Sequence, residues 1–372
     1  MKITIVLGAF FPVPPLFGGA VEKVWFALAQ EFVRQGHSVV QISCTNPALP
    51  AEEETEGVRH LRVRGYTQPS SVVRLKWRDL LYSLRVRRIL PPADILVTNS
   101  FWLPLLVRQE NRGRIYVHVA RGPRGQMRWY WRAARLQTVS RAIAQQIIAE
   151  APRLAPKVSV IPNPLALPLE SLPEKERERK ILYVGRIHPE KGIELLLRAI
   201  RLLPAELRSC WKIRLVGPHE VEYGGGGESF LRKMQALGRE NGTEVDWSGK
   251  IFEPSRLAEE YRSAPIFVYP SIAETGEAFG LAALEAMAHG CVPLVSKLDC
   301  FSEFLVEGTN GFVFDHRAPE PAKSLAAALQ ALLTTDRDRL KQIGQSARAK
   351  AAEFELPKIA RLYLRDFGRL LS

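Results

Sequence analysis

The sequence lacks the G-x-G-x-x-G fingerprint of dinucleotide-binding oxidoreductases. Its second strand-like stretch ends at Ser43-Cys44-Thr45, without the acidic residue that holds a nucleotide ribose in those enzymes. No Gly-Lys-Ser or Gly-Lys-Thr follows its glycine-rich segments, so a P-loop is absent as well. These absences disfavour an NAD- or FAD-dependent oxidoreductase and a P-loop nucleotidase.

Cysteine is scarce, and the four cysteines show no paired spacing: Cys44, Cys210, Cys291 and Cys300. Reduced thiols are therefore expected, and neither disulfides nor a cysteine metal site. Long apolar runs are also missing. Residues 3–21 carry no charge, but they contain Pro12, Pro14, Pro15, Gly18 and Gly19, which a membrane-spanning helix tolerates poorly. We expect a buried strand running into a loop there.

Positive charge is concentrated in the first half of the chain. The formal net charge is +13, and residues 1–163 hold 23 Lys and Arg against 10 Asp and Glu. Residues 164–372 are balanced, at 29 against 29. Such an asymmetry favours an anionic partner for the first half, either a membrane surface, a phosphorylated acceptor or nucleic acid. No nucleic-acid-binding motif accompanies the charge, so we expect no nucleic acid.

The chain is long enough for two domains, with 372 residues of which 46% are hydrophobic. Residues 2–44 read as strand, helix and strand, which predicts a parallel, doubly wound α/β domain. A proline-containing, charged linker follows Pro162, and a strand at Lys180–Val184 opens a second α/β domain. We predict domains at 1–163 and 164–352, with a last helix in 353–372 that crosses back to the first domain.

One helix-like stretch, residues 74–88, is strongly basic and amphipathic. It carries six Lys and Arg against one acid, Asp79, and its apolar stripe consists of Trp77, Leu80, Leu81 and Leu84. We expect this stripe to pack on the domain's own sheet. The alternative is a helix that lies on an anionic bilayer.

Two loops of the second domain carry candidate chemistry. Arg186 and Lys191 follow the strand Lys180–Val184, where a guanidinium and an ammonium can clamp a pyrophosphate. Glu277 precedes an alanine-rich helix that contains Glu285, and the first turn of such a helix offers free N–H groups to a phosphate. The alternative for the second loop is a buried helix with two solvated glutamates. The run Tyr223–Gly227 is expected to be a flexible insertion.

The spacing of Glu277 and Glu285 resembles the E-x7-E motif of the retaining glycosyltransferases of family GT4. The Gly185-Arg186 and Lys191-Gly192 pairs also resemble that family, and the likeness covers most of the chain, most strongly from 180 to 315. It implies the GT-B architecture, which is two Rossmann-like doubly wound domains that face each other across a cleft. The first would bind the acceptor and the second the nucleotide sugar.

The resemblance and the local patterns together assign the site residues. Catalytic roles fall to His118, Glu277, Arg186 and Lys191, with His118 near the anomeric carbon of the donor sugar. Donor-binding residues are expected to be Gly18, Gly19, Ser140, Gly185, Lys250, Ile251, Phe279, Gly280, Leu281 and Glu285. Arg121 and Arg124 are expected to bind the acceptor.

The implied activity is retaining transfer of a hexosyl group from a nucleotide-diphosphate sugar to a saccharide or lipid-linked acceptor. Cell-surface polysaccharide or glycolipid synthesis at the cytoplasmic face of a membrane would suit the basic first domain. A UDP-sugar is preferred over a GDP-sugar. No cofactor or metal is expected, because two cations and a helix start can stabilise the leaving diphosphate. Alternatives are a nucleotide-sugar epimerase or hydrolase, and a non-enzymatic basic module that binds membranes or nucleic acid.

Overall fold

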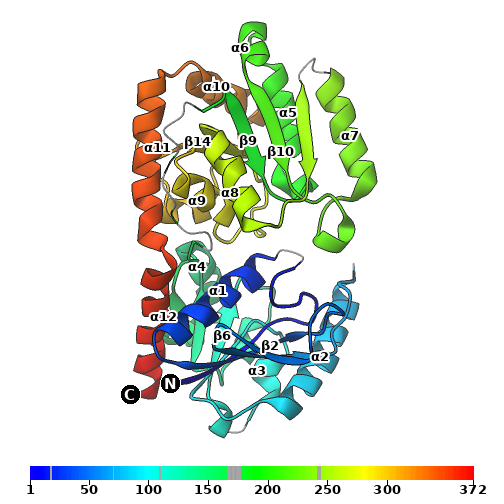
Figure 1. The fold of residues 1–372 in the computed structure, drawn as a ribbon, viewed down its shortest axis with the longest axis vertical. Coiled ribbons are helices and arrows are strands. Elements are labelled where there is room, and N and C mark those ends of the chain that lie inside the picture. The colour runs from blue at the N-terminus through cyan, green and yellow to red at the C-terminus, as the bar shows by residue number, and fades with distance from the viewer. Residues whose placement is uncertain are drawn as a thin grey trace. The chain divides into compact units, whose positions relative to one another are not determined.

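The structure is a computed structural model that describes residues 1–16, 19–69, 71–108, 110–165, 169, 172, 177–240 and 244–372. The chain forms two compact units, and each is described by itself. Unit 1 comprises Met1–Ala166 together with Leu356–Ser372, and unit 2 comprises Leu167–Glu355. Figure 1 labels their elements. The final helix therefore belongs to the unit that is formed mainly by the start of the chain.

Unit 1 is built on an eight-stranded sheet with the order β3-β4-β2-β1-β5-β6-β7-β8. All its pairings are parallel except that of β3 with β4. The strands are β1 (Lys2–Val6), β2 (Ser38–Cys44), β3 (Glu52–Thr55), β4 (Val58–Val63), β5 (Ile95–Thr98), β6 (Arg114–Val119), β7 (Arg135–Thr138) and β8 (Val158–Val160). The helices are α1 (Ala20–Arg34), α2 (Val72–Ile89), α3 (Leu103–Leu106), α4 (Arg141–Glu150) and α12 (Leu356–Leu371).

The antiparallel hairpin at the edge of this sheet was not predicted. Thr55 pairs with Val58, which leaves a loop of Glu56 and Gly57, and both have positive φ, 53° and 72°. Two-residue hairpin loops of this kind require that conformation at both positions. The Glu56-Gly57 pair between the strands was the available sequence signal.

Unit 2 is a six-stranded parallel sheet with the order β11-β10-β9-β12-β13-β14. Its strands are β9 (Lys180–Val184), β10 (Lys212–Val216), β11 (Val245–Gly249), β12 (Ile266–Tyr269), β13 (Val292–Ser296) and β14 (Phe312–Phe314). Its helices are α5 (Ile193–Arg201), α6 (Ala205–Cys210), α7 (Gly227–Glu240), α8 (Pro254–Ser263), α9 (Leu281–Ala288), α10 (Pro321–Leu333) and α11 (Arg337–Ala351). Strands β12 and β13 are buried throughout, as expected for a parallel sheet covered on both faces.

Both sheets reverse their strand order once. The reversal lies between β1 and β5 in unit 1 and between β9 and β12 in unit 2. In doubly wound sheets, ligands bind beyond the carboxyl ends of the two strands at this switch point. The prediction of two Rossmann-like α/β sheets is confirmed, and the chemistry of unit 2 should lie in the loops after β9 and β12.

Helix α12 is held in unit 1 by polar and aromatic contacts. The hydroxyl of Tyr116 donates to Asp366 at 2.9 Å, and Arg135 donates to the same carboxylate at 2.7 Å. The ring of Tyr363 packs edge-on against Trp25 of α1, with ring centroids 5.1 Å apart. The predicted helix within 353–372 thus begins at Leu356, after a short 3-10 turn at Ala352–Phe354.

Helix α2 is oriented differently from the prediction. Its buried residues are Asp79, Tyr82, Ser83 and Val86. Trp77 and Leu84 of the predicted inner stripe are exposed, at 61% and 37%. The polar inner face is satisfied because the carboxylate of Asp79 accepts from the Ser100 hydroxyl and from the backbone N–H groups of Phe101 and Trp102, at 3.0–3.1 Å.

Within the described part of the chain, no helix is both long enough and apolar enough to cross a bilayer.

Candidate active site

The two predicted loops of unit 2 meet at the switch point of the sheet. Arg186 and Lys191 follow β9, and Glu277 follows β12, the neighbouring strand. Gly192 permits this approach, because a Cβ at that position would lie 1.9 Å from the carbonyl oxygen of Pro270. Its φ of 70° is also a conformation that glycine adopts without strain. Lys191 is thereby brought against the end of β12.

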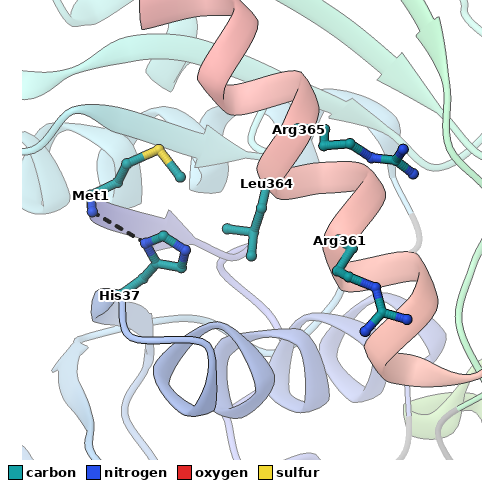
Figure 2. Close-up of a pocket in the computed structure, with 5 residues that line it drawn as sticks. All are labelled: Met1, His37, Arg361, Leu364 and Arg365. Atoms are coloured by element: carbon teal, nitrogen blue, oxygen red, sulfur yellow. Dashed lines mark hydrogen bonds between the residues drawn. The ribbon is translucent and has the colours of Figure 1, made fainter.

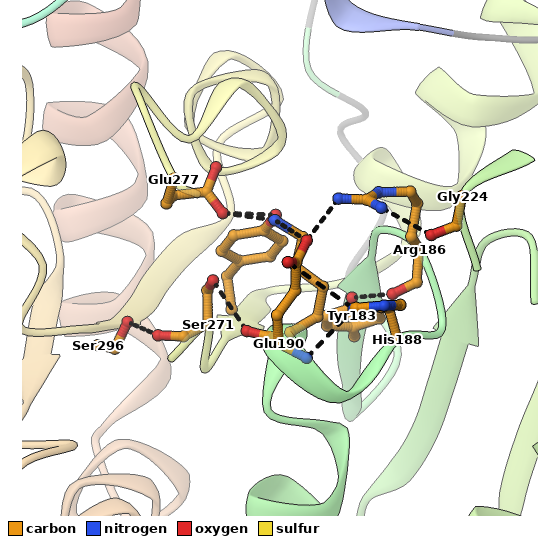
Figure 3. A network of polar contacts seen from close by, with 10 residues as sticks. Tyr183, Arg186, His188, Glu190, Gly224, Ser271, Glu277 and Ser296 are labelled. Carbon is orange, nitrogen blue, oxygen red and sulfur yellow. Dashed lines mark hydrogen bonds and ion pairs between the residues drawn. The ribbon is translucent and has the colours of Figure 1, made fainter. Parts of the chain in front are cut away.

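A network of alternating charges fills this position (Figure 3). The Lys191 ammonium lies 2.7 Å from the Glu277 carboxylate, which also accepts a hydrogen bond from the Tyr269 hydroxyl at 3.1 Å. Arg186 donates to Glu190 at 2.5 Å and to the carbonyl oxygen of Gly224 at 2.6 Å. Glu190 is also 4.0 Å from Lys191. Two cations and two carboxylates therefore alternate in one cluster.

The pair of Lys191 and Glu277 is nearly buried, whereas the side chains of Arg186 and Glu190 are each 34% exposed. The side chains of Lys191 and Glu277 are only 7% and 10% exposed, so neither charge is well hydrated. Burial alone would raise the pKa of Glu190, but the charges of Arg186 and Lys191 outweigh it and hold that pKa below its ordinary value. Burial, and then the Glu277 carboxylate, raise the pKa of Tyr269, so its hydroxyl stays protonated and donates. An anionic group that enters here can replace a carboxylate on either cation.

The start of α9 is fixed beside this cluster by aromatic packing. The ring of Phe279 is buried against Phe304 and Phe354, with centroids 5.4 and 5.9 Å apart. Gly280 caps the helix with φ 78°, and a Cβ there would lie 2.3 Å from the Phe301 ring. The backbone N–H groups from Phe279 to Leu281 lie at this helix start, and the first N–H groups and the dipole of a helix favour a phosphate.

Glu285 lies within α9 and is buried. The hydroxyl of Tyr261, on α8, donates to its carboxylate at 3.1 Å. The predicted ribose contact of Glu285 stays a prediction, and Tyr261 is the residue that orients this carboxylate.

The remaining predicted donor residues of unit 2 follow neighbouring strands. Gly185 follows β9, and its N–H donates to the carbonyl oxygen of Val216 at 2.9 Å. Lys250 and Ile251 follow β11, at the edge of the sheet. The Lys250 ammonium pairs with Glu220 at 3.0 Å and lies 4.3 Å above the Tyr223 ring. The Lys250 ammonium is thus already engaged, and the contact of these two residues with a nucleobase stays a prediction.

His118 is buried in β6 of unit 1, and its hydrogen bonds define its tautomer. The amide nitrogen of Gln137 donates to the carbonyl oxygens of Thr138 and Ile161, both at 2.8 Å, so its oxygen faces His118 Nδ1 at 2.6 Å as an acceptor. Nδ1 must carry the proton, and Nε2 then holds a lone pair. Burial lowers the pKa of His118 to about 4, against a smaller opposite effect of Gln137. The imidazole is therefore neutral near pH 7, and its Nε2 can accept a hydrogen bond.

The other predicted residues of unit 1 lie in loops at helix starts or strand ends. Gly19 caps α1 with φ 93°, and Gly18 lies outside the described residues. Ser140 is buried and caps α4, where its hydroxyl accepts from the N–H of Ile143 at 3.4 Å. Arg121 and Arg124 are exposed in the loop after β6. Their proposed ligand contacts remain predictions.

Three site residues were missed by sequence reasoning, namely Glu190, Tyr269 and Gly224. The run Tyr223–Gly227 was expected to be a flexible insertion, and this was wrong. The N–H groups of its four glycines donate to backbone carbonyls at 2.7–2.9 Å, and the Gly224 carbonyl accepts from Arg186. Glu190 directly precedes Lys191. An acid between two predicted phosphate-binding cations was the sequence signal that could have identified it as a site residue.

Among the described residues, no three His, Cys, Asp or Glu side chains are grouped so that they could hold a metal ion. The chain does contain one Asp-x-Asp sequence, Asp336-Arg337-Asp338, which in other transferases holds a metal on the diphosphate. Here Asp336 is the N-cap of α11 and accepts from the N–H of Asp338 at 2.8 Å. This pair is explained by helix capping, and metal independence stays a prediction.

A cavity in unit 1 lies away from these residues. Met1, His37 and three residues of α12, Arg361, Leu364 and Arg365, line it (Figure 2). Met1 precedes β1 and His37 precedes β2, so the cavity is at the amino ends of the strands. Ligands of doubly wound sheets bind at the opposite edge.

The fold is that of a doubly wound α/β protein, and two cations and two carboxylates of unit 2 cluster at the switch point of its sheet. Two family profiles match the chain, "Glycosyltransferase Family 4" over residues 17–167 and "Glycosyl transferases group 1" over residues 169–350. The chain therefore belongs to the group 1/GT4 family of glycosyltransferases and is an enzyme of that family.

Individual relatives agree with this family assignment. The chain is 26% identical over 332 residues to the lipopolysaccharide 1,2-N-acetylglucosaminetransferase of Salmonella typhimurium, with 84% of each chain covered. It superposes on sucrose-phosphate synthase from Thermosynechococcus elongatus with a TM-score of 0.79 at 21% identity, covering 99% of this chain and 98% of the other. Anabaena HepE, in complex with UDP and glucose, gives a TM-score of 0.73 at 17% identity, covering 99% and 100%. The two structures show the shared GT-B fold.

Proposed function

We propose that this enzyme transfers a hexosyl group, with retention of anomeric configuration, from a nucleotide-diphosphate sugar to a saccharide or lipid-linked acceptor. The observation that carries the proposal is the convergence of Arg186, Lys191 and the start of α9 at the switch point of unit 2. Each of these binds negative charge, and together they suit a diphosphate.

The reaction breaks the bond between the anomeric carbon and the diphosphate oxygen, so negative charge develops on the leaving group. In the proposed mechanism, Arg186 and Lys191 exchange their carboxylate partners for the diphosphate, and this charge is then stabilised where it forms. The acceptor oxygen bonds to the anomeric carbon on the same face, and its proton passes to the departing phosphate oxygen. Donor binding and leaving-group stabilisation thus use the same two cations.

Glu277 is assigned to the sugar hydroxyls. A covalent intermediate would need a free carboxylate beneath the anomeric carbon. Glu277 instead accepts from Tyr269 and, in its assigned role, from the sugar hydroxyls, which reduces its nucleophilicity. We assign His118 to the donor sugar as a hydrogen-bond acceptor, because its neutral imidazole offers the Nε2 lone pair. It would position a hydroxyl and would not act as an acid.

For the donor we propose a UDP-sugar in preference to a GDP-sugar. The UDP bound to the structurally similar HepE supports this choice. For the acceptor we propose a lipid-linked or phosphorylated saccharide at the cytoplasmic face of a membrane, in cell-surface polysaccharide or glycolipid synthesis. The lipopolysaccharide enzyme of Salmonella and the basic first half of this chain support it.

A transfer assay with and without acceptor tests the proposal. UDP-sugars and GDP-sugars are incubated with the enzyme alone and with a panel of saccharide acceptors, and the products are separated by mass. Glycosylated acceptor with the anomeric configuration retained supports the proposal. Free sugar or an isomerised nucleotide sugar, formed equally well without acceptor, would instead show a hydrolase or an epimerase.

The donor is found first by thermal unfolding. Nucleoside diphosphates and nucleotide sugars are added singly, and the one that binds the native state raises the midpoint most. A guanosine diphosphate that outperforms the uridine compound would replace the proposed donor class. No shift by any nucleotide would contradict a nucleotide-sugar enzyme.

A further inference from the structure

The outward side of α2 is apolar and cationic at once. We define this outer face by Val73, Arg74, Trp77, Leu84 and Arg88. Val73, Trp77 and Leu84 are 77%, 61% and 37% exposed. With about 100° per residue, they lie opposite the buried side of the helix, and the two arginines lie along one side of them. The structure thus exposes a hydrophobic stripe that unit 1 does not cover.

Three further cations of α2, Lys76, Arg78 and Arg85, contact aromatic rings of unit 1, and Arg87 is exposed. Arg78 and Arg85 lie 5.7 and 5.1 Å from the centre of the Tyr66 ring, and Lys76 lies 4.7 Å above Phe101. The helix's single acid, Asp79, is buried and hydrogen-bonded. The outer face is therefore purely cationic and apolar, without a carboxylate from its own helix.

A second cationic surface begins four residues beyond the end of α2, at Ala93. This groove is lined by Asp94, Val107, Gly113, Ile115, Ala133, Ala134 and Leu371, and by the cations Arg108, Arg114, Arg132 and Lys157. Its carboxylate, Asp94, accepts from the N–H of Lys2 at 2.7 Å. Trp131 beside it is 60% exposed and lies 4.7 Å from the Arg132 guanidinium. Tryptophan next to arginine is typical of residues at a membrane–water interface.

We propose that unit 1 docks on an anionic lipid bilayer through the outer face of α2. In this arrangement Val73, Trp77 and Leu84 enter the boundary between headgroups and acyl chains, and Arg74 and Arg88 contact lipid phosphates. A second copy of the chain is a poor occupant, because the arginines of two such faces would repel each other. A nucleic acid would pair with the arginines but would leave the apolar stripe in water.

Vesicle sedimentation tests this docking in the absence of donor and acceptor. A protein that fails to bind vesicles would therefore not contradict the proposed transferase activity. The full chain should pellet with vesicles of phosphatidylglycerol and phosphatidylcholine in equal parts. It should not pellet with phosphatidylcholine alone, and salt should release it. The variant Arg74→Glu/Arg88→Glu should bind at least about 30-fold more weakly, and Trp77→Ser/Leu84→Ser about tenfold more weakly.

Matched controls remove the same charge and the same apolar area elsewhere. Arg201→Glu/Arg239→Glu changes exposed arginines of unit 2, and Leu202→Ser/Val221→Ser changes side chains that are 50% and 71% exposed. Both should keep vesicle binding and, like the α2 variants, the wild-type midpoint of thermal unfolding. Equal losses in the control and α2 pairs would overturn the proposal. So would full binding by Trp77→Ser/Leu84→Ser, or a dimer in light scattering that this variant dissociates.

Discussion

The ammonium of Lys191 lies 2.7 Å from the carboxylate of Glu277, although 86 positions separate the two residues. This contact joins the loops after β9 and β12, and both partners are nearly buried. Arg186 and Glu190 form a parallel pair a few residues away. The site therefore holds its cations in place with its own carboxylates, and the proposed diphosphate would have to compete with them.

Glu190→Gln should tighten the binding of nucleoside diphosphates. The amide keeps the size of the side chain but removes the charge that competes for Arg186, so the dissociation constant should fall by about three- to tenfold. Calorimetric titration measures it. Glu194→Gln is the matched control, because Glu194 pairs with Arg198 and Lys233 away from the site and should leave affinity unchanged. Weaker binding by Glu190→Gln would show that Glu190 supports the ligand instead of competing with it.

Glu277→Gln should reduce kcat by about 100-fold or more while nucleoside diphosphate affinity stays the same or rises. The amide weakens the contact with the sugar hydroxyls and releases Lys191 for the diphosphate. Initial rates and calorimetric titration on one preparation separate the two effects. An unchanged kcat would remove Glu277 from the site chemistry, and a loss of diphosphate binding would assign it to the nucleotide.

Gln137→Glu should make transfer depend on pH through His118. A carboxylate beside Nδ1 raises the histidine pKa, and the imidazole then carries a proton at Nε2 and can no longer accept there. We expect kcat in the variant to rise with pH through this raised pKa, with little change in KM. Wild-type kcat should show no such step, because its His118 titrates near pH 4. Gln145→Glu, on exposed α4 surface, is the control, and identical profiles for all three proteins would exclude this role of His118.

Glu22 should make the fold less stable as pH rises. Burial raises its pKa from the ordinary 4.5 to about 7, against smaller effects of its own backbone and of Arg121. Between these values the native state keeps a proton that the unfolded chain has released, so the free energy of unfolding falls as pH increases. Glu22→Gln should remove this slope and stabilise the protein by about 3 kcal/mol at pH 8.

Urea unfolding of wild type and Glu22→Gln between about pH 4.5 and 8 gives the difference in their free energies of unfolding. His118 contributes a slope of opposite sign below pH 6.5, but it does so in both proteins, so its contribution cancels in the difference. Glu31→Gln, on the same helix, should leave the pH slope in place. A constant difference between wild type and Glu22→Gln at every pH would contradict the raised pKa.

The sequence was sufficient for the fold class and for the principal loops of unit 2. Buried strands such as Ile266–Tyr269 are continuous apolar runs, and Gly192 and Gly280 mark backbone positions that glycine alone occupies without strain. The sequence was not sufficient to identify Glu190, Tyr269 and Gly224 as site residues, because their roles depend on which loops meet at the switch point.

Helix α2 shows a second reason why the sequence alone was not sufficient. Its periodicity correctly predicted an amphipathic helix, but periodicity does not say which side faces the sheet. Asp79 can be buried because its carboxylate accepts hydrogen bonds from the Ser100 hydroxyl and from two backbone N–H groups, those of Phe101 and Trp102. Ser83 can be buried because its hydroxyl is hydrogen-bonded to that of Ser100 at 2.8 Å. Those partners come from a distant loop, so a helical projection alone could not reveal them.

If Arg186 and Lys191 bind the donor diphosphate, a variant without these two cations should bind it far more weakly, and calorimetric titration measures this affinity. The nucleoside diphosphate with the largest thermal shift is titrated into wild type, into Arg186→Met/Lys191→Met, and into the control Arg198→Met/Lys233→Met, whose cations pair with Glu194 instead. The site variant alone should lose affinity by about 100-fold or more. Full affinity in that variant would contradict the binding of the diphosphate by these two cations.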